Sequence, residues 1–267
     1  MHNIQIAASQ IVQQVMVDGR NLNQVLDESL RKKSVWTPAQ RAALQDLSYG
    51  TLRYFGQLEG LLSLLLHNPL SDERIRYLLL VALYQLQYSK AAQHAVVDHA
   101  VKSAQMQHVK VSGLVNAILR NFLRNQTQLL QQVVQRVEAK HNHPNWWIAE
   151  LKTQYADAST AILAAGNQHP PMTLRVNQRR GSTGDYLAKL TGQQIAATII
   201  EPDAIQLAKP VGVDKLPGFF DGLVSVQDAG AQYAATLLDL HDGQRVLDGC
   251  AATVGKTAHI FECATVV

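Results

Sequence analysis

The chain of 267 residues is 47% hydrophobic and 17% charged, so it is long enough and apolar enough for two or three globular units with their own cores. Its net charge of +3 is unevenly distributed: residues 1–140 hold 15 Lys and Arg against 9 Asp and Glu, and the remainder holds 9 against 12. The basic first half favours a polyanionic partner such as nucleic acid, although a solvated helical surface would have the same charge.

Composition argues against secreted and membrane classes. Cys250 and Cys263 are the two cysteines of the sequence, so no disulfide framework is expected. The first residues show no charged segment followed by an apolar one, and the longest apolar run, 78–83, is far shorter than the roughly 20 residues of a membrane helix. We expect a monomer in the cytoplasm, without a membrane partner.

Apolar residues recur at helical spacing throughout residues 4–140. Ile75, Leu79, Leu83 and Leu86 are one example of this pattern. Helix periodicity over such a length predicts an all-α bundle, and we expect residues 1–140 to form a domain that folds on its own.

The expected helix boundaries are marked by local signals. Gly19 follows the first helix, and Thr37 with Pro38 supplies an N-cap and a first helical residue. Ser71, with the acidic residues 72–73 in the opening turn, starts a later helix.

Three segments of this half, 45–54, 97–101 and 116–124, resemble a helical RNA-binding domain of the kind found in the antitermination factor NusB. Arg120 and Arg124 lie one helical turn apart in the last segment, so both can project from one face and bridge a phosphate. Alternatively, the two arginines extend over the apolar surface of the bundle.

Residues 141–145 interrupt the helical pattern with turn formers, which places a domain boundary there. Trp146 and Trp147 follow, and we expect them to anchor a helix over residues 148–155 by apolar burial.

Histidine spacing does not favour a metal site. His94 and His99, five residues apart, do not share a helix face well. His141 and His143 could ligate a metal together, but no Cys or carboxylate set accompanies them, so no metal is expected.

Residues 141–221 are predicted to form a small α+β unit. Residues 172–177 alternate as a half-buried strand, with Leu174 and Val176 on one side and Arg175 on the other. A helix at 185–190 and strands at 196–200 and 223–227 complete it. The phosphate-binding candidates in this unit are Arg175, Arg179 and Arg180.

The stretch 246–257, Val-Leu-Asp-Gly-Cys-Ala-Ala-Thr-Val-Gly-Lys-Thr, reads as a strand, a small-residue turn and a helix start. Small residues let a ligand approach the backbone at the carboxyl end of a strand, which points to a nucleotide-like cofactor. A phosphate-binding loop needs four residues between its first Gly and Gly-Lys-Thr, whereas Gly249 and Gly255 enclose five. The other reading is a loop that contains Gly-Lys-Thr without function.

This stretch resembles the cofactor loop of the bacterial 16S ribosomal RNA cytosine-5 methyltransferases of the Sun/Fmu family, which reads Leu-Asp-x-Cys-Ala-Ala-Pro-Gly-Gly-Lys-Thr. The resemblance implies that S-adenosylmethionine is bound by Cys250, Ala251, Ala252, Thr253, Val254, Gly255 and Lys256. Thr253 and Val254 replace the family's Pro and first Gly, and a β-branched Val takes the positive φ angles of Gly only with strain.

The resemblance covers nearly the whole chain and implies a multidomain α plus α/β fold. Its parts are an all-α NusB-like bundle (1–140), a linker helix with a small ferredoxin-like α+β RNA-binding subdomain (141–221), and the beginning of a Rossmann-like methyltransferase domain (222–267). The segment 222–232 also resembles the strand and helix that precede the family's cofactor strand. The implied reaction is methylation of carbon 5 of a cytosine in 16S ribosomal RNA, with S-adenosylmethionine as cofactor.

Family members add a cysteine thiolate to the ring, from Thr-Cys-Ser and Pro-Cys motifs downstream of the cofactor loop. Neither Cys250 nor Cys263 has that context, so no catalytic residue is assigned. We expect a C-terminally truncated, inactive methyltransferase; the alternative is a non-catalytic RNA-binding protein of the NusB type. Residues 244–267 are expected to be poorly covered at Val246, Leu247, Ile260 and Phe261, because a lone strand cannot bury both of its faces.

Overall fold

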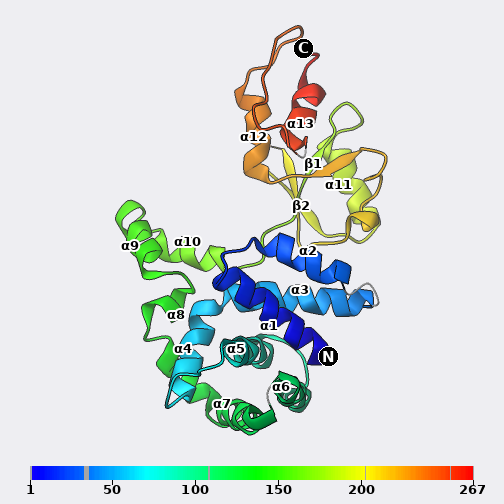
Figure 1. The fold of residues 1–267 in the computed structure, drawn as a ribbon. Coiled ribbons are helices and arrows are strands. Elements are labelled where there is room, and N and C mark those ends of the chain that lie inside the picture. Colours follow the sequence, from blue (N-terminus) through cyan, green and yellow to red (C-terminus); the bar gives the residue numbers. More distant parts are fainter. Residues whose placement is uncertain (1, 33–35, 108, 202, 253, 267) are drawn as a thin grey trace. The chain divides into compact units, whose positions relative to one another are not determined.

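The structure is a computed structural model that describes residues 2–32, 36–107, 109–201, 203–252 and 254–266. The chain divides into two compact units, Met1–Gln168 and His169–Val267, and each is described by itself (Figure 1). The division after Gln168 does not coincide with the expected boundaries after residues 140 and 221, which remain a prediction.

The first unit is helical, as the periodicity predicts. Its elements are α1 (His2–Met16), α2 (Leu22–Lys32), α3 (Pro38–Arg53), α4 (Phe55–Leu65), α5 (Glu73–Tyr88), α6 (Gln93–Gln107), a short 3-10 turn (Val109–Val111), α7 (Ser112–Val133), α8 (Val137–His141), α9 (Asn145–Gln154) and α10 (Ser159–Gly166).

Helix α5 is the centre of this unit. Every residue from Tyr77 to Leu86 is buried, so the helix is covered on all sides and not along one stripe only. Helices α1, α3, α4, α6 and α7 pack against it. The continuous apolar run of the sequence therefore forms the core helix of a bundle.

Local capping signals define the starts of two of these helices. Thr37 and Gln40 form a capping box around Pro38, in which each side chain accepts the backbone N–H of the other residue. At α5 the N-cap is Asp72, whose side chain accepts from the Arg74 amide, so the expected cap at Ser71 is displaced by one residue.

Helices α3 and α5 approach each other closely at Gly50. A Cβ on this residue would lie 1.9 Å from the ring of Tyr84, so only glycine fits there. Tyr84 is stacked with Tyr54 and Tyr88, and its hydroxyl donates to Asp46 at 3.2 Å. The segment 45–54 is therefore a packing site between two helices.

The last helices of the unit correct one expectation. Ile148 and Leu151 of α9 pack with Leu163 of α10 in a small apolar cluster. Trp146 and Trp147 lie on the outer side of α9 and are 69% and 37% exposed, so they do not anchor the helix by burial. The register of the helix directs the smaller aliphatic residues inward instead.

The second unit contains a four-stranded antiparallel sheet of order β2-β3-β1-β4. Its elements are β1 (Thr173–Val176), α11 (Thr183–Gly192), β2 (Ala197–Ile200), β3 (Ala204–Leu207), a 3-10 turn (Val213–Lys215), β4 (Val224–Val226), α12 (Ala229–Leu237) and α13 (Gly255–Cys263). Strand β3 was not predicted, although the turn residue Asp203 before it is the kind of signal that marks a hairpin.

Strand β1 is buried on both faces, not half-buried as predicted. Leu174 and Val176 contribute to a core with Tyr186 and Leu190 of α11. Arg175, on the other face, contacts α13. Because helices cover both faces, the alternation of apolar and polar residues along β1 does not mark a solvent-facing side.

In residues 222–267 one predicted strand is present and another is not. Strand β4 pairs with β1, with Arg175 opposite Ser225, so it belongs to the same sheet as the preceding strands. Residues 244–248 form no strand, contrary to the prediction for Val246 and Leu247. A strand requires a neighbour to accept its backbone hydrogen bonds, and none pairs with this segment in the described part of the chain.

Candidate functional site

The basic pair of the first unit lies on the surface of α7. Arg120 and Arg124 are both exposed and one turn apart, while Ile118 and Phe122 are buried beneath them. Helical φ and ψ angles are interrupted at Asn125, directly after the pair. The arginines thus occupy the end of the straight first part of α7, where their side chains can reach one anionic group.

A groove of about 330 Å³ lies beside Arg120, between the beginning of α6 and the beginning of α7. Its lining residues are His94, Val97, Asp98, Val101, Ser112, Gly113, Asn116 and Arg120. Arg120 Nε donates to Asn116 Oδ1 at 2.9 Å, which directs the guanidinium along the groove. The lining combines the aliphatic Val97 and Val101 with polar side chains, among them the Asp98 carboxylate and the Arg120 cation, so Arg120 is the group that could meet a phosphate there.

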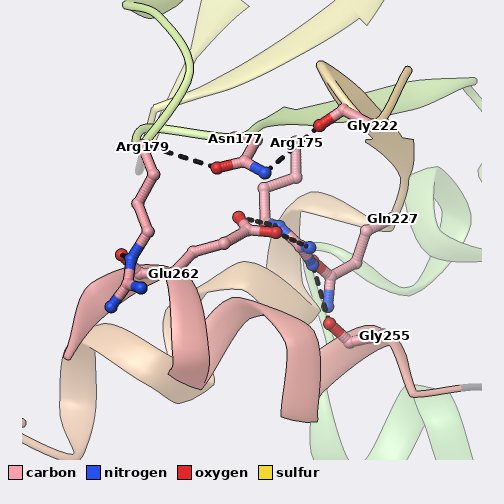
Figure 2. Close-up of polar contacts among 7 residues, drawn as sticks. All are labelled: Arg175, Asn177, Arg179, Gly222, Gln227, Gly255 and Glu262. Atoms are coloured by element: carbon pink, nitrogen blue, oxygen red, sulfur yellow. Dashed lines mark hydrogen bonds and ion pairs between the residues drawn. The ribbon is translucent and has the colours of Figure 1, made fainter. Parts of the chain in front are cut away.

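Two of the three arginine candidates of the second unit are also exposed. Arg179 and Arg180 lie in the turn after β1. The side chain of Asn177 orders this turn: its Oδ1 accepts from the Arg179 amide at 3.1 Å, and its Nδ2 donates to the Gly222 carbonyl at 3.1 Å (Figure 2). Arg179 Nε donates to the Glu262 carbonyl at 3.1 Å, and Arg180 donates to the Asp221 carbonyl. Their remaining N–H groups face solvent and could meet phosphate.

Arg175 is placed differently and does not fit the phosphate role expected of it. The residue is 3% exposed, and its guanidinium binds Glu262, Gln227 and the Gly255 carbonyl within the second unit (Figure 2). Sequence reasoning missed Glu262 and Gln227 as partners, because contacts between residues more than 50 positions apart leave no local pattern.

The expected cofactor loop has an ordered turn. Asp248 Oδ2 accepts from the Thr257 hydroxyl at 2.6 Å, and Asp248 Oδ1 accepts from the Cys250 amide at 3.0 Å. These hydrogen bonds, first that of Thr257, hold the pKa of the Asp248 carboxyl below its usual range. Val254 has φ +57°, the left-handed region that favours glycine, and Gly255 begins α13 directly after it. Thr253 lies outside the described residues.

These residues fit the turn of a nucleotide-binding site, but the buried strand that should lie beneath such a turn is not formed in the described residues. An acidic residue, small side chains and a helix start follow one another, as such a turn requires. Leu247, however, is 92% exposed in the segment where a buried strand should underlie the loop. Ile260, expected to be poorly covered, is only 7% exposed, whereas Phe261 is 51% exposed as expected. No cofactor geometry follows from this arrangement.

The environment of Cys263 does not activate its thiol. Cys250 and Cys263 are free and exposed. Desolvation, together with the neighbouring Glu262 carboxylate, raises the pKa of the Cys263 thiol, so the reactive thiolate is disfavoured.

Within the residues described, no group of three or more His, Cys, Asp and Glu side chains is arranged to hold a metal ion. His143 Nδ1 lies 2.7 Å from the His141 carbonyl oxygen. In the same described ranges, no helix is long and apolar enough to cross a membrane.

Two family models match the chain. The NusB family model matches residues 2–124, which span α1 to the first part of α7 and include Arg120 and Arg124. The model described as Methyltr_RsmF/B-like, ferredoxin-like domain matches residues 143–214, which include β1, α11, β2 and β3. Both models agree with the resemblances that the sequence motifs indicate.

Curated relatives match almost the whole chain. It is 40% identical over 268 residues to ribosomal RNA small subunit methyltransferase B of Yersinia pestis bv. Antiqua (strain Angola), and equally to that of Yersinia pseudotuberculosis serotype O:1b (strain IP 31758). Each match covers 98% of this chain and 62% of the relative, so the chain spans less than two thirds of their length.

One solved structure has the same fold. The crystal structure of PH0851 aligns over 98% of this chain and 60% of that chain, with a TM-score of 0.63 and 18% sequence identity. At this identity the match supports the arrangement of elements and not an activity.

Proposed function

Because the chain belongs to the family of the ribosomal RNA small subunit methyltransferase B proteins, we propose that it serves in the methylation of carbon 5 of a cytosine in 16S ribosomal RNA. The observation that carries this proposal is the order of parts in one chain: a NusB-like bundle with an exposed arginine pair, then an α+β unit that leads into a cofactor-type loop. We place the protein in the cytoplasm as a monomer.

In this proposal the first unit binds the RNA. Arg120 and Arg124 hold a phosphate, and the groove beside Arg120 receives part of an adjacent nucleotide. Arg179 and Arg180 contact the backbone of the same RNA from the second unit, because both are exposed at one turn. Arg175 is excluded from this set by its burial.

The loop of residues 250–256 is proposed as the contact for S-adenosylmethionine, which supplies the methyl group when bound. Asp248 and Thr257 keep the turn closed, and the amides at the start of α13 face the loop. Attack at cytosine carbon 6 needs a low-pKa thiol, and the raised pKa of Cys263 does not supply one. The 267 residues are therefore assigned RNA binding and part of cofactor binding, and no nucleophile.

RNA binding is tested with the Arg120→Ala, Arg124→Ala double variant and an unmodified 16S ribosomal RNA fragment. The double variant should bind about 10-fold more weakly, with a slope of log affinity against log salt smaller by roughly 0.7–0.9, the value for the one phosphate that the pair holds. Arg31→Ala with Lys32→Ala removes the same charge from the exposed end of α2 and is the matched control. Equal affinities for both double variants would contradict the assignment of this face.

A non-catalytic RNA-binding protein is the second candidate. The exposed Leu247 and the missing strand at residues 244–248 favour this second candidate, because a cofactor loop needs a buried strand beneath it. Calorimetric titration with S-adenosylmethionine separates the two candidates: saturable binding that Lys256→Ala weakens supports the methyltransferase assignment. RNA binding without any cofactor binding supports the alternative.

A further inference from the structure

The side chain of Arg175 extends from β1 to both ends of α13. Its Nη1 donates to the carbonyl of Gly255, the first residue of that helix, at 2.7 Å (Figure 2). Its Nε and Nη2 donate to the two carboxylate oxygens of Glu262, in the last turn, at 3.1 and 2.7 Å. One guanidinium therefore fixes the position and the direction of the whole helix.

This contact is buried, and its donors have hydrogen-bond acceptors. The side chains of Arg175 and Glu262 are 4% and 12% exposed. Arg175 Nη1 also donates to Gln227 Oε1 at 2.6 Å, and the Gln227 carbonyl accepts from the Thr173 hydroxyl at 2.6 Å. Four of the five guanidinium N–H groups thus have acceptors, a geometry that the planar fork of Arg satisfies and Lys cannot.

Helix α13 also packs against α12, and its Thr257 hydroxyl donates to Asp248, but its apolar burial is small. Among its described residues only Ile260 is buried, and the N-cap residue Val254 makes no side-chain capping hydrogen bond. A helix of nine residues is marginal in water without tertiary contacts. The Arg175 contacts join this helix directly to strand β1 of the sheet.

We propose that Arg175 is a positioning residue that holds α13, and with it the turn 248–255, in the shape that the cofactor loop requires. The proposal rests on the proposed function of that loop. Arg175 lies 80 positions before Gly255 in the sequence. It acts through its ion pair with Glu262 and its hydrogen bond to the end of α13, and not through contact with RNA or cofactor.

Hydrogen exchange of the full chain tests the clamp directly, with Arg175→Lys as the variant. The amides of residues 256–263 should exchange on the order of 100-fold faster, while α11 keeps its protection. Lysine keeps the positive charge but cannot make the four hydrogen bonds of the guanidinium, so buried acceptors at both ends of α13 lose their donors. Arg179→Lys is the matched control, because Arg179 is exposed and touches α13 only through the Glu262 carbonyl. It should leave exchange in α13 within about twofold of the original rate.

A second variant distinguishes the loss of the Arg175 contacts from general unfolding of the unit. Glu262→Gln keeps the size of the side chain and removes its charge, so it should accelerate the same amides, and the double variant with Arg175→Lys should be no faster than Arg175→Lys alone. Equal acceleration in α11 and α13 would show a general core defect and overturn the proposal. So would unchanged exchange of residues 256–263 in both single variants.

Cofactor titration distinguishes this proposal from the function on which it rests. If the unmodified chain binds S-adenosylmethionine, Arg175→Lys should weaken binding at least about 10-fold and Arg179→Lys should not. If the unmodified chain does not bind it, the cofactor assignment of the loop fails, and with it the cofactor role of Arg175. The exchange data then still decide whether Arg175 holds α13.

Discussion

The Thr257 hydroxyl lies 2.6 Å from Asp248 Oδ2 and donates to it, so a residue in the first turn of α13 closes the loop that leads into the helix. The second carboxylate oxygen accepts from the Cys250 amide at 3.0 Å. One side chain therefore organises both the beginning and the end of the turn, independently of any bound molecule.

Asp248→Asn should open this turn. The variant loses the charge that strengthens both hydrogen bonds, so proteases should cleave between residues 248 and 257 faster than in the unmodified chain. Asp239→Asn is the control, because Asp239 is exposed and its carboxylate lies 3.7 Å from His241 Nε2. Equal cleavage rates in the two variants would contradict the role of Asp248.

His259 should make the second unit less stable in acid. Burial, and then the charge of Arg175, lower the pKa of His259 below its ordinary value of 6.5, against the opposing effect of Glu262. The unfolded chain then binds a proton that the folded chain does not, so stability rises with pH between the lowered pKa and 6.5 and is lost as pH falls through this window. Imidazole resonances, assigned with His259→Gln, should titrate below 6.5; titration at or above this value would contradict the prediction.

Val254→Gly should stabilise the second unit. Val254 has φ +57°, where a β-branched residue is strained and glycine is not, so relief of about 1 kcal/mol in the free energy of unfolding is expected. Hydrogen exchange in α13 measures the change. Ala252→Gly provides the comparison, since it adds chain flexibility without relieving a positive φ and should destabilise by about 0.5 kcal/mol. Destabilisation by Val254→Gly would show that the valine side chain makes a compensating contact.

Gly50→Ala should destabilise the first unit. The added Cβ would overlap the Tyr84 ring between α3 and α5, and overpacking of this kind costs about 1–3 kcal/mol of the free energy of unfolding. Gly113→Ala is the matched control: a Cβ there meets nothing within 4 Å, and alanine favours helix over glycine. Urea denaturation followed by circular dichroism should give opposite or unequal shifts, and equal shifts would contradict the packing role of Gly50.

Local signals gave correct predictions for several elements whose interactions are supplied by neighbours along the chain. The 3.6-residue periodicity predicted the helices of the first unit, and Thr37-Pro38 predicted the start of α3. The pair Arg120 and Arg124 was placed on one exposed helix face for the same reason, because residues four apart in a helix always lie on one side.

The errors concern residues whose environment depends on distant partners. Trp146 and Trp147 are apolar, but the rotation of α9 turns Ile148 and Leu151 inward and leaves the tryptophans outside. Leu247 lies in a segment that has the composition of a strand, yet no strand forms there in the described residues. A strand is defined by pairing, which composition alone does not provide.

By itself the sequence determined the helical bundle, the four-position spacing of its two arginines, and the small-residue turn with Asp248 and Thr257, because each depends on spacing along the chain. Only the tertiary structure decided that Arg175 is a buried partner of Glu262 and not a surface cation. An alternating strand presents the same pattern whether its polar face meets water or a helix. The difference lies in α13, which folds over that face from 80 residues further on.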